Sequence, residues 1–292
     1  MPPTIDPARL VPRTLDIAGV ATAVIDTGAP EASAHAAAHA ADAALPLLLL
    51  HGSGPGVTAT ANWRVVAPEF ARTRRVVAPD QLGFGGTATG QDRQFGRAAW
   101  TEHAIAVMDA VGLDRVDVVG NSMGGAIALS LAAAVPDRVR RVVAMGSVGI
   151  QMPLSEGLDD VWGYTPSFEN MERIVHLFTD DERLITGDLI TMRYEASAVP
   201  TIRASWEAMF PAPRQRWLDD LALSQDELKS LRQPTLLIHG RDDRVIPLAT
   251  SSIPMMNLIP DVELHVFGGC GHWTMIERAP QFVTLVSDFL DR

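Results

Sequence analysis

The sequence has a single cysteine, no excess of basic residues and no long apolar run. The lone Cys270 excludes a disulfide within the chain and suits a reducing compartment such as the cytoplasm. The formal net charge is −11, from 24 basic and 35 acidic residues, and no basic cluster offsets it locally. This balance argues against nucleic acid or an anionic membrane as the main partner.

Targeting and membrane-spanning signals are missing as well. The first residues lack the apolar core of a signal peptide, and the most apolar run, Leu47 to Leu50, is far too short to cross a bilayer. We therefore expect a cytoplasmic protein. Its 292 residues, 47% of them hydrophobic, are enough for one large α/β domain with a sizeable core.

Short apolar runs alternate with helix-like stretches along most of the chain. Several of the runs consist of Val, Ile and Leu, as is typical of strands covered on both faces. The expected strands are residues 21–26, 47–51, 75–79, 116–119, 139–145, 235–239 and 263–267, with helices such as 97–111, 125–135 and 280–290. This repetition predicts an α/β fold with a doubly wound, mostly parallel sheet.

The alternation stops between about residues 150 and 231. That segment holds three of the six tryptophans, together with many Met and Phe residues. We interpret it as a helical lid that covers an apolar pocket. The predicted division is core at 1–149, lid at 150–231 and core again at 232–292. The alternative, that the segment only packs on the core, stays open.

Residues 31–44 form a low-complexity stretch rich in alanine and histidine. His35 and His39 are four residues apart, so a helix would place both imidazoles on one face, where a metal ion is conceivable. An Ala-rich surface insertion between two strands is the favoured interpretation.

A serine interrupts an apolar run between an expected strand and an expected helix. The segment Gly120-Asn121-Ser122-Met123-Gly124 matches the nucleophile elbow G-x-S-x-G, in which a sharp turn exposes the serine hydroxyl. The strand–turn–helix context makes this weak pentapeptide informative. A tight packing turn is the alternative.

A serine nucleophile needs a base and an orienting carboxylate. His272 is the favoured base because it follows a strand on a glycine-rich loop, whereas His51 and His239, at strand ends, are weaker candidates. The segment after residues 235–239 supplies Asp242 and Asp243, which the pattern alone does not separate. The chain order is then Ser, Asp, His, as in α/β-hydrolases.

An oxyanion hole requires two N–H donors. Met123, the residue after the nucleophile, supplies one, and we assign the other to Ser53 in the glycine-rich loop after the second expected strand. A phosphate-binding function for this loop is disfavoured because the P-loop lysine is missing.

Together, HGSGPGVTATANW, PDQLGFG, GNSMGG, GRDDRVIPL and CGHWTMIE resemble the meta-cleavage-product hydrolases, which are carbon–carbon bond hydrolases of the α/β-hydrolase fold. The resemblance runs from about Leu15 to Leu290, excluding the Ala/His-rich insertion, and is greatest to the 2-hydroxymuconic semialdehyde hydrolases. It implies an α/β-hydrolase core with a helical lid. It also implies hydrolysis of a catechol ring-fission product to 2-hydroxypenta-2,4-dienoate and a short carboxylic acid.

The resemblance also assigns residues. It implies a triad of Ser122, Asp243 and His272, with Ser53 and Met123 at the oxyanion hole. It further implies a small anionic substrate, no metal and no organic cofactor, and it leaves a homo-oligomer open. The substrate-pocket positions that it implies are Asn62, Asn121, Arg193 and Trp273.

Arg193 also has independent physical support. The implied substrate carries a carboxylate that the protein's net charge repels, and a local guanidinium would offset this repulsion. The alternative is a surface arginine paired with Glu195 or another acid. Asn62 and Asn121 could instead be turn residues, and Trp273 ordinary core. The family usually has Trp where Thr60 stands, so a wider pocket or a shifted loop is expected there.

Two rival functions use the same residues differently. A carboxylesterase or lactonase would use the same triad on an ester, and a small-molecule receptor would keep the fold without turnover. Epoxide hydrolases and haloalkane dehalogenases are disfavoured because they have Asp at the elbow, where this chain has Ser122.

Overall fold

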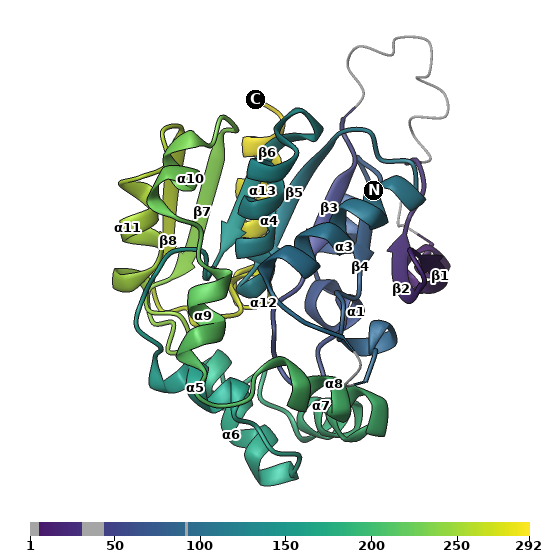
Figure 1. The fold of residues 1–292 in the computed structure, drawn as a ribbon, viewed down its shortest axis with the longest axis vertical. Coiled ribbons are helices and arrows are strands. Elements are labelled where there is room, and N and C mark those ends of the chain that lie inside the picture. The colour runs from purple at the N-terminus through teal and green to yellow at the C-terminus, as the bar shows by residue number, and fades with distance from the viewer. Residues whose placement is uncertain (1–5, 31–43, 91–92) are drawn as a thin grey trace.

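Eight strands form one sheet in the computed structural model, which describes residues 6–30, 44–90 and 93–292 (Figure 1). Their order across the sheet is β1-β2-β4-β3-β5-β6-β7-β8. β1 and β2 are antiparallel to their neighbours, and all other pairs are parallel. The bounds are β1 Arg13–Ile17, β2 Val20–Asp26, β3 Leu47–Leu50, β4 Val76–Pro79, β5 Val116–Asn121, β6 Val139–Met145, β7 Thr235–Gly240 and β8 Val262–Phe267.

The central strands β3, β4 and β5 are buried along their whole length, which agrees with their nearly continuous apolar sequences. This confirms the predicted mostly parallel α/β sheet. β1 was not expected. It pairs with β2 through a two-residue turn in which Ala18 and Gly19 both have positive φ, and Ala-Gly is a weak sequence signal for such a turn.

Helices cover both faces of the sheet. α3 (Arg97–Ala110) and α4 (Met123–Ala134) pack against each other on one face, while α13 (Ala279–Leu290) lies behind the sheet in the same view (Figure 1). Phe70 of α2 (Ala67–Phe70) contacts Phe282 of α13. The remaining core helices are α1 (Ala59–Trp63), α11 (Ser252–Met256) and α12 (Thr274–Glu277).

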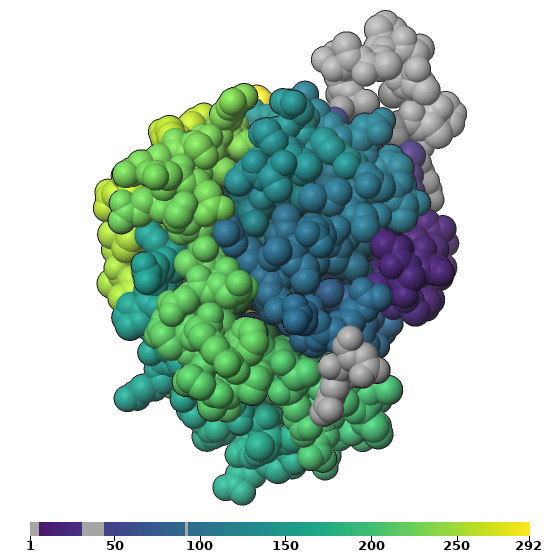
Figure 2. Space-filling model, viewed as in Figure 1, coloured from purple at the N-terminus to yellow at the C-terminus, as the bar shows by residue number. Residues whose placement is uncertain are grey.

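Six helices and no strand lie between β6 and β7, and they begin and end within the segment 150–231. Much of this segment lies beyond the carboxyl ends of the parallel strands, and Figure 2 shows its teal and green part forming the lower part of the molecule. We refer to it as the helical insertion. Its helices are α5 (Glu156–Trp162), α6 (Phe168–Phe178), α7 (Gly187–Ala198), α8 (Pro200–Met209), α9 (Gln215–Leu221) and α10 (Gln225–Ser230).

His35 and His39, and with them the question of metal binding or surface insertion, lie outside the described residues. Among the helices of the described ranges, none combines the length and the apolar character needed to cross a membrane.

Candidate active site

The serine of the predicted elbow lies at a sharp turn between β5 and α4. Ser122 has φ 55° and ψ −118°, a conformation that residues other than glycine seldom adopt, so surrounding packing must hold it. A Cβ atom at Gly120 would collide with the carbonyl oxygen of Gly124, and one at Gly124 would collide with that of Leu50. The two glycines therefore let α4 approach β5 and β3 closely enough to form the turn.

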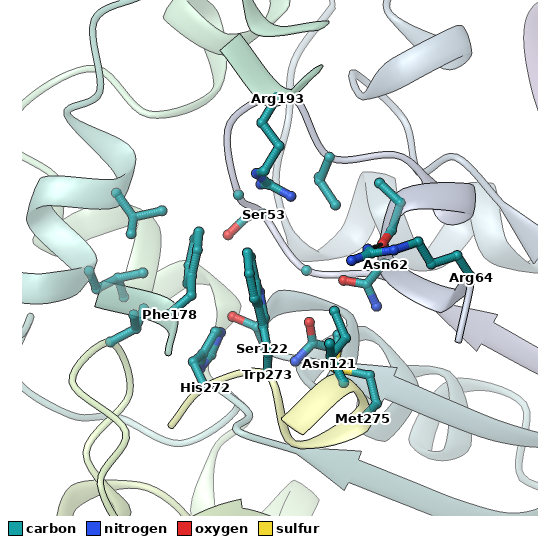
Figure 3. Close-up of a pocket in the computed structure, with 18 residues that line it drawn as sticks. Ser53, Asn62, Arg64, Asn121, Ser122, Phe178, Arg193, His272, Trp273 and Met275 are labelled. Carbon is teal, nitrogen blue, oxygen red and sulfur yellow. Dashed lines mark hydrogen bonds between the residues drawn. The ribbon is translucent and has the colours of Figure 1, made fainter. Parts of the chain in front are cut away.

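An imidazole and a carboxylate from two neighbouring loops meet at the cavity that Ser122 faces. Nδ1 of His272, in the loop after β8, lies 2.7 Å from Oδ2 of Asp243, in the loop after β7. The carboxylate accepts a hydrogen bond from the Nδ1–H group, which leaves Nε2 as the basic nitrogen. Ser122 and His272 line the same cavity, and Figure 3 shows the serine hydroxyl directed toward the ring.

The tertiary structure distinguishes the two candidate carboxylates. Asp243 is buried, and its Oδ1 accepts two backbone N–H groups of the following turn at 2.8 Å each. Burial disfavours its charge, but the charge of His272 and hydrogen bonds from His239 and His272 outweigh burial and lower the pKa of Asp243. Asp242 instead pairs with Arg241 on the surface.

The competing histidines are engaged elsewhere. His239 is bonded through Nδ1 to a serine hydroxyl and through Nε2 to a backbone carbonyl, and its Nε2 lies 3.5 Å from Oδ2 of Asp243, the oxygen that His272 also contacts. Nε2 of His51 accepts the N–H of Gln81 at 2.9 Å. Burial, reinforced by the charge of Arg93, lowers the pKa of His103 to about 4.

The expected oxyanion-hole donors come from the elbow and from the loop after β3. Met123 is the first residue of α4, so no preceding helical turn offers its N–H an acceptor. The N–H of Ser53 likewise has no acceptor within the described ranges. A Cβ atom at Gly52 would lie 3.1 Å from that of Ser122, so this glycine brings the loop against the elbow.

The helical insertion reaches this loop through one hydrogen bond that sequence reasoning missed. The indole N–H of Trp162, at the end of α5, donates to Oγ of Ser53 at 2.9 Å. The indole also stacks on Phe210, with ring centroids 4.5 Å apart and planes 3° apart. The sequence marked Trp162 only as one aromatic residue of the insertion, because its partner lies 109 residues away.

Arg193 on α7 is buried, with 5% of its surface exposed. Its Nη2 donates to the carbonyl of Pro55 at 2.8 Å, and its guanidinium lies 5.7 Å and 5.4 Å from the ring centres of Phe178 and Trp273. Burial, and then the charge of Arg64, lower its pKa to about 10. Within the described ranges it forms no ion pair, so the alternative pairing with an acid is not observed.

The other expected pocket residues, Asn62, Asn121 and Trp273, line the same cavity. The amide nitrogens of both asparagines have no hydrogen-bond partner among the described residues, an arrangement that costs free energy unless a ligand or water satisfies them. Trp273 stacks on Phe178 at 4.8 Å. The expectation for Thr60 is not supported, because its side chain is exposed and outside the cavity lining.

Two further residues of the cavity wall were not predicted. Phe178 carried no signal that separated it from other aromatic residues of the insertion. Arg64 had a usable sequence signal, because it follows the predicted pocket residue Asn62 by two positions. Within the described ranges, no three His, Cys, Asp or Glu side chains are grouped as metal ligands.

Comparison with known proteins adds evidence from most of the chain. Residues 46–279 match the family model described as alpha/beta hydrolase fold. The chain is 52% identical to a 2-hydroxymuconate semialdehyde hydrolase of Pseudomonas sp. (strain CF600), over 86% of this chain and 89% of that protein. It is 51% identical to a 2-hydroxy-6-oxo-2,4-heptadienoate hydrolase of Pseudomonas putida, over 86% and 91% of the two chains.

Solved structures give the same picture. The fold matches that of a meta-cleavage product hydrolase from Pseudomonas fluorescens IP01 with a TM-score of 0.89 and 42% identity, over 96% of this chain and 98% of that one. It also matches a 2-hydroxy-6-oxo-6-phenylhexa-2,4-dienoate hydrolase from Rhodococcus sp. strain RHA1 with a TM-score of 0.83 and 28% identity, over 97% and 99% of the two chains.

Proposed function

The chain belongs to the alpha/beta hydrolase fold family and, within it, to the meta-cleavage product hydrolases, and we propose from this that it cleaves a carbon–carbon bond in a catechol ring-fission product. The substrate is 2-hydroxymuconic semialdehyde or a 6-alkyl analogue. The products are 2-hydroxypenta-2,4-dienoate and a short carboxylic acid. One observation carries the proposal: a single cavity is lined by Ser122, by His272 with Asp243 bonded behind it, and by a buried arginine that has no carboxylate partner among the described residues.

Each residue has a defined task in this reaction. His272, oriented by Asp243, takes the proton of Ser122, and the N–H groups of Ser53 and Met123 stabilise the oxyanion that forms at the attacked carbonyl. Arg193 binds the substrate carboxylate. The amides of the two pocket asparagines and the face of Trp273 orient the conjugated chain between these ends.

Breaking a carbon–carbon bond needs an acceptor for its electron pair. The dienol first converts to a ketone by moving its enol proton to carbon, and the keto group then accepts the electrons as the bond breaks. Two routes share this geometry. Ser122 attacks the distal carbonyl to form an acyl-enzyme that water hydrolyses, or it helps water add directly to give a gem-diol. Neither route requires an external oxidant or reductant.

Replacement of the serine tests the proposal. Ser122→Ala is expected to lower turnover of the yellow ring-fission product at least about 1000-fold, because a triad acts as a unit. The loss of its visible absorbance measures the rate. Ser130→Ala, on the same helix α4, is the matched control and should keep wild-type turnover. Bleaching by Ser122→Ala at the wild-type rate would remove Ser122 as nucleophile.

A simple ester distinguishes the rival hydrolase. The wild-type protein should show a higher kcat/KM on the ring-fission product than on a neutral ester of similar size. The reverse ranking would make it an esterase, and tight binding of the ring-fission product without turnover would make it a receptor. We also propose a cytoplasmic location, with which the free, buried Cys270 is compatible.

A further inference from the structure

The cavity has an unusual balance of charged groups. Its ionisable lining residues are Arg64, Arg193 and His272, and the described residues contribute no carboxylate to its wall. The whole chain, by contrast, carries an excess of 11 negative charges. Two guanidinium groups facing one cavity repel each other, and an anion bound between them would offset this repulsion.

Arg64 and Arg193 come from opposite parts of the fold. Arg64 directly follows α1 of the core, whereas Arg193 belongs to α7 of the helical insertion. Figure 3 shows both guanidinium groups directed into the cavity from different sides, with that of Arg64 beside Asn62. Arg64 is exposed, which places it where the cavity meets solvent, and its Nη1 donates to the carbonyl of Ala61 at 2.6 Å.

Neither guanidinium is neutralised by the protein. Within the described ranges, neither forms an ion pair with a carboxylate, whereas Arg72, two residues after α2, pairs with Glu69 at 2.9 Å. The two positive charges influence each other, since the charge of Arg64 contributes to the lowered pKa of Arg193. Burial also lowers the pKa of Arg64 itself. Both groups still remain positively charged at neutral pH.

The substrate class named above can supply two negative charges on neighbouring carbons. Its carboxylate is always ionised near neutral pH. Its enol is conjugated through two carbon–carbon double bonds to a carbonyl, so it is a vinylogous acid that loses its proton far more readily than an alcohol does. The doubly ionised form therefore presents a carboxylate and an enolate oxygen on adjacent carbons, two anionic groups for the two guanidinium groups that line the cavity.

We propose that Arg64 is a second anion-binding residue and that the enzyme binds its substrate as the dianion, with carboxylate and enolate held between Arg64 and Arg193. This inference rests on the proposed function and names the ionisation state that the site selects. The enol proton is released to solvent when the dianion forms, and Arg64 stabilises the enolate until a proton from solvent is delivered to carbon to give the ketone. His272 is the remaining titratable group of the cavity wall, and it lies at the Ser122 end.

Titration of the bound chromophore tests the proposal without turnover. The enol and enolate of the ring-fission product absorb at different visible wavelengths, so Ser122→Ala protein saturated with 2-hydroxymuconic semialdehyde reports the ionisation of the bound ligand. We expect the pKa of the bound enol to lie about one unit or more below that of the free compound, a tenfold shift of its ionisation equilibrium. Adding Arg64→Gln to this protein should raise the pKa of the bound enol by about one unit, toward that of the free compound. Arg64→Lys should largely preserve the lowered pKa.

Arg72→Gln in the same background is the matched control and should leave the titration unchanged. The proposal is overturned if Arg64→Gln titrates like the Ser122→Ala parent, or if the ligand binds only as the monoanion or not at all. Turnover by the wild-type protein is measured separately. Hydrolysis of the ring-fission product with no effect of Arg64 on the bound enol would leave the proposed function in place and remove only this role of Arg64.

Discussion

Arg193 is the side chain whose burial a purely structural role explains least well. A guanidinium with 5% exposure normally has a carboxylate partner, yet this one contacts a carbonyl and two aromatic faces, and its Nε has no partner among the described residues. The cost of this burial is recovered when an anion binds. We therefore assign Arg193 to the wall of an anion-binding cavity, because a bound carboxylate would supply the charge partner that the described residues lack.

Removal of that charge should separate carboxylated substrates from neutral ones. Arg193→Met is expected to lower kcat/KM for the ring-fission product about 10- to 100-fold, the usual effect of losing a hydrogen bond to a charged group. Hydrolysis of a neutral ester should change much less. Arg216→Met, on the exposed side of α9, is the control. Equal losses of kcat/KM on both substrates would contradict the proposed binding of the substrate carboxylate by Arg193.

Single residues were predicted well where local chain geometry constrained them. The glycines beside Ser122 follow from the turn itself, since any side chain at Gly120 or Gly124 would meet backbone atoms. The choice between Asp242 and Asp243 could not be made from the pattern of residues. It depends on which carboxylate turns inward to His272, a contact across 29 residues.

At the scale of elements, α5 and the loop after β3 are joined by the Trp162–Ser53 hydrogen bond. Trp162 is fixed by its stack on Phe210, so this bond holds the loop that carries an expected oxyanion donor. The same insertion also contacts the base, because the N–H of His272 donates to the carbonyl of Phe178 at 2.8 Å. The insertion therefore contacts the two core segments that carry the proposed oxyanion donor and base, and it also lines the cavity.

Trp162→Phe keeps the aromatic stack and removes only the N–H donor. We expect kcat to fall about 3- to 10-fold with KM nearly unchanged, because one neutral hydrogen bond contributes about 0.5–1.5 kcal/mol and this one acts on a transition-state donor. Steady-state kinetics measure the separate effects on kcat and KM. Ser53→Ala should produce a similar loss, and the double variant should be no slower than either single one. Additive losses would show that the two side chains act independently.

Across the whole molecule, a buried charge network joins the sheet to the carboxyl-terminal helix. Asp117 of β5 is fully buried and accepts two hydrogen bonds from Arg140, at 2.9 Å and 2.6 Å. Arg74 lies 3.5 Å from the same carboxylate and also contacts Asp291, while Arg140 donates to the carbonyl of Leu290. None of these residues lines the active-site cavity. We therefore expect the network to affect the stability of the fold and not the rate of the reaction.

Asp117→Ala should lower the free energy of unfolding by up to about 3–5 kcal/mol, because it removes the buried carboxylate that Arg140 and Arg74 share and leaves the buried Arg74 only the exposed Asp291. Urea denaturation measures the change, and kcat under native conditions should stay at the wild-type value. Glu69→Ala, which breaks the exposed pair with Arg72, should cost at most about 1 kcal/mol. A loss of that small size for Asp117→Ala would mean that the network contributes little to folding.

The sequence by itself determined the features that depend on neighbouring residues. Apolar runs of strand length alternating with helices determine a parallel sheet, and glycines at fixed offsets determine the elbow, because backbone sterics act over a few positions. Only the tertiary structure decided which side chains share the cavity, which carboxylate orients His272, and that Arg64 and Arg193 converge without an acid between them. These facts depend on burial and on contacts between distant segments, which no local pattern encodes.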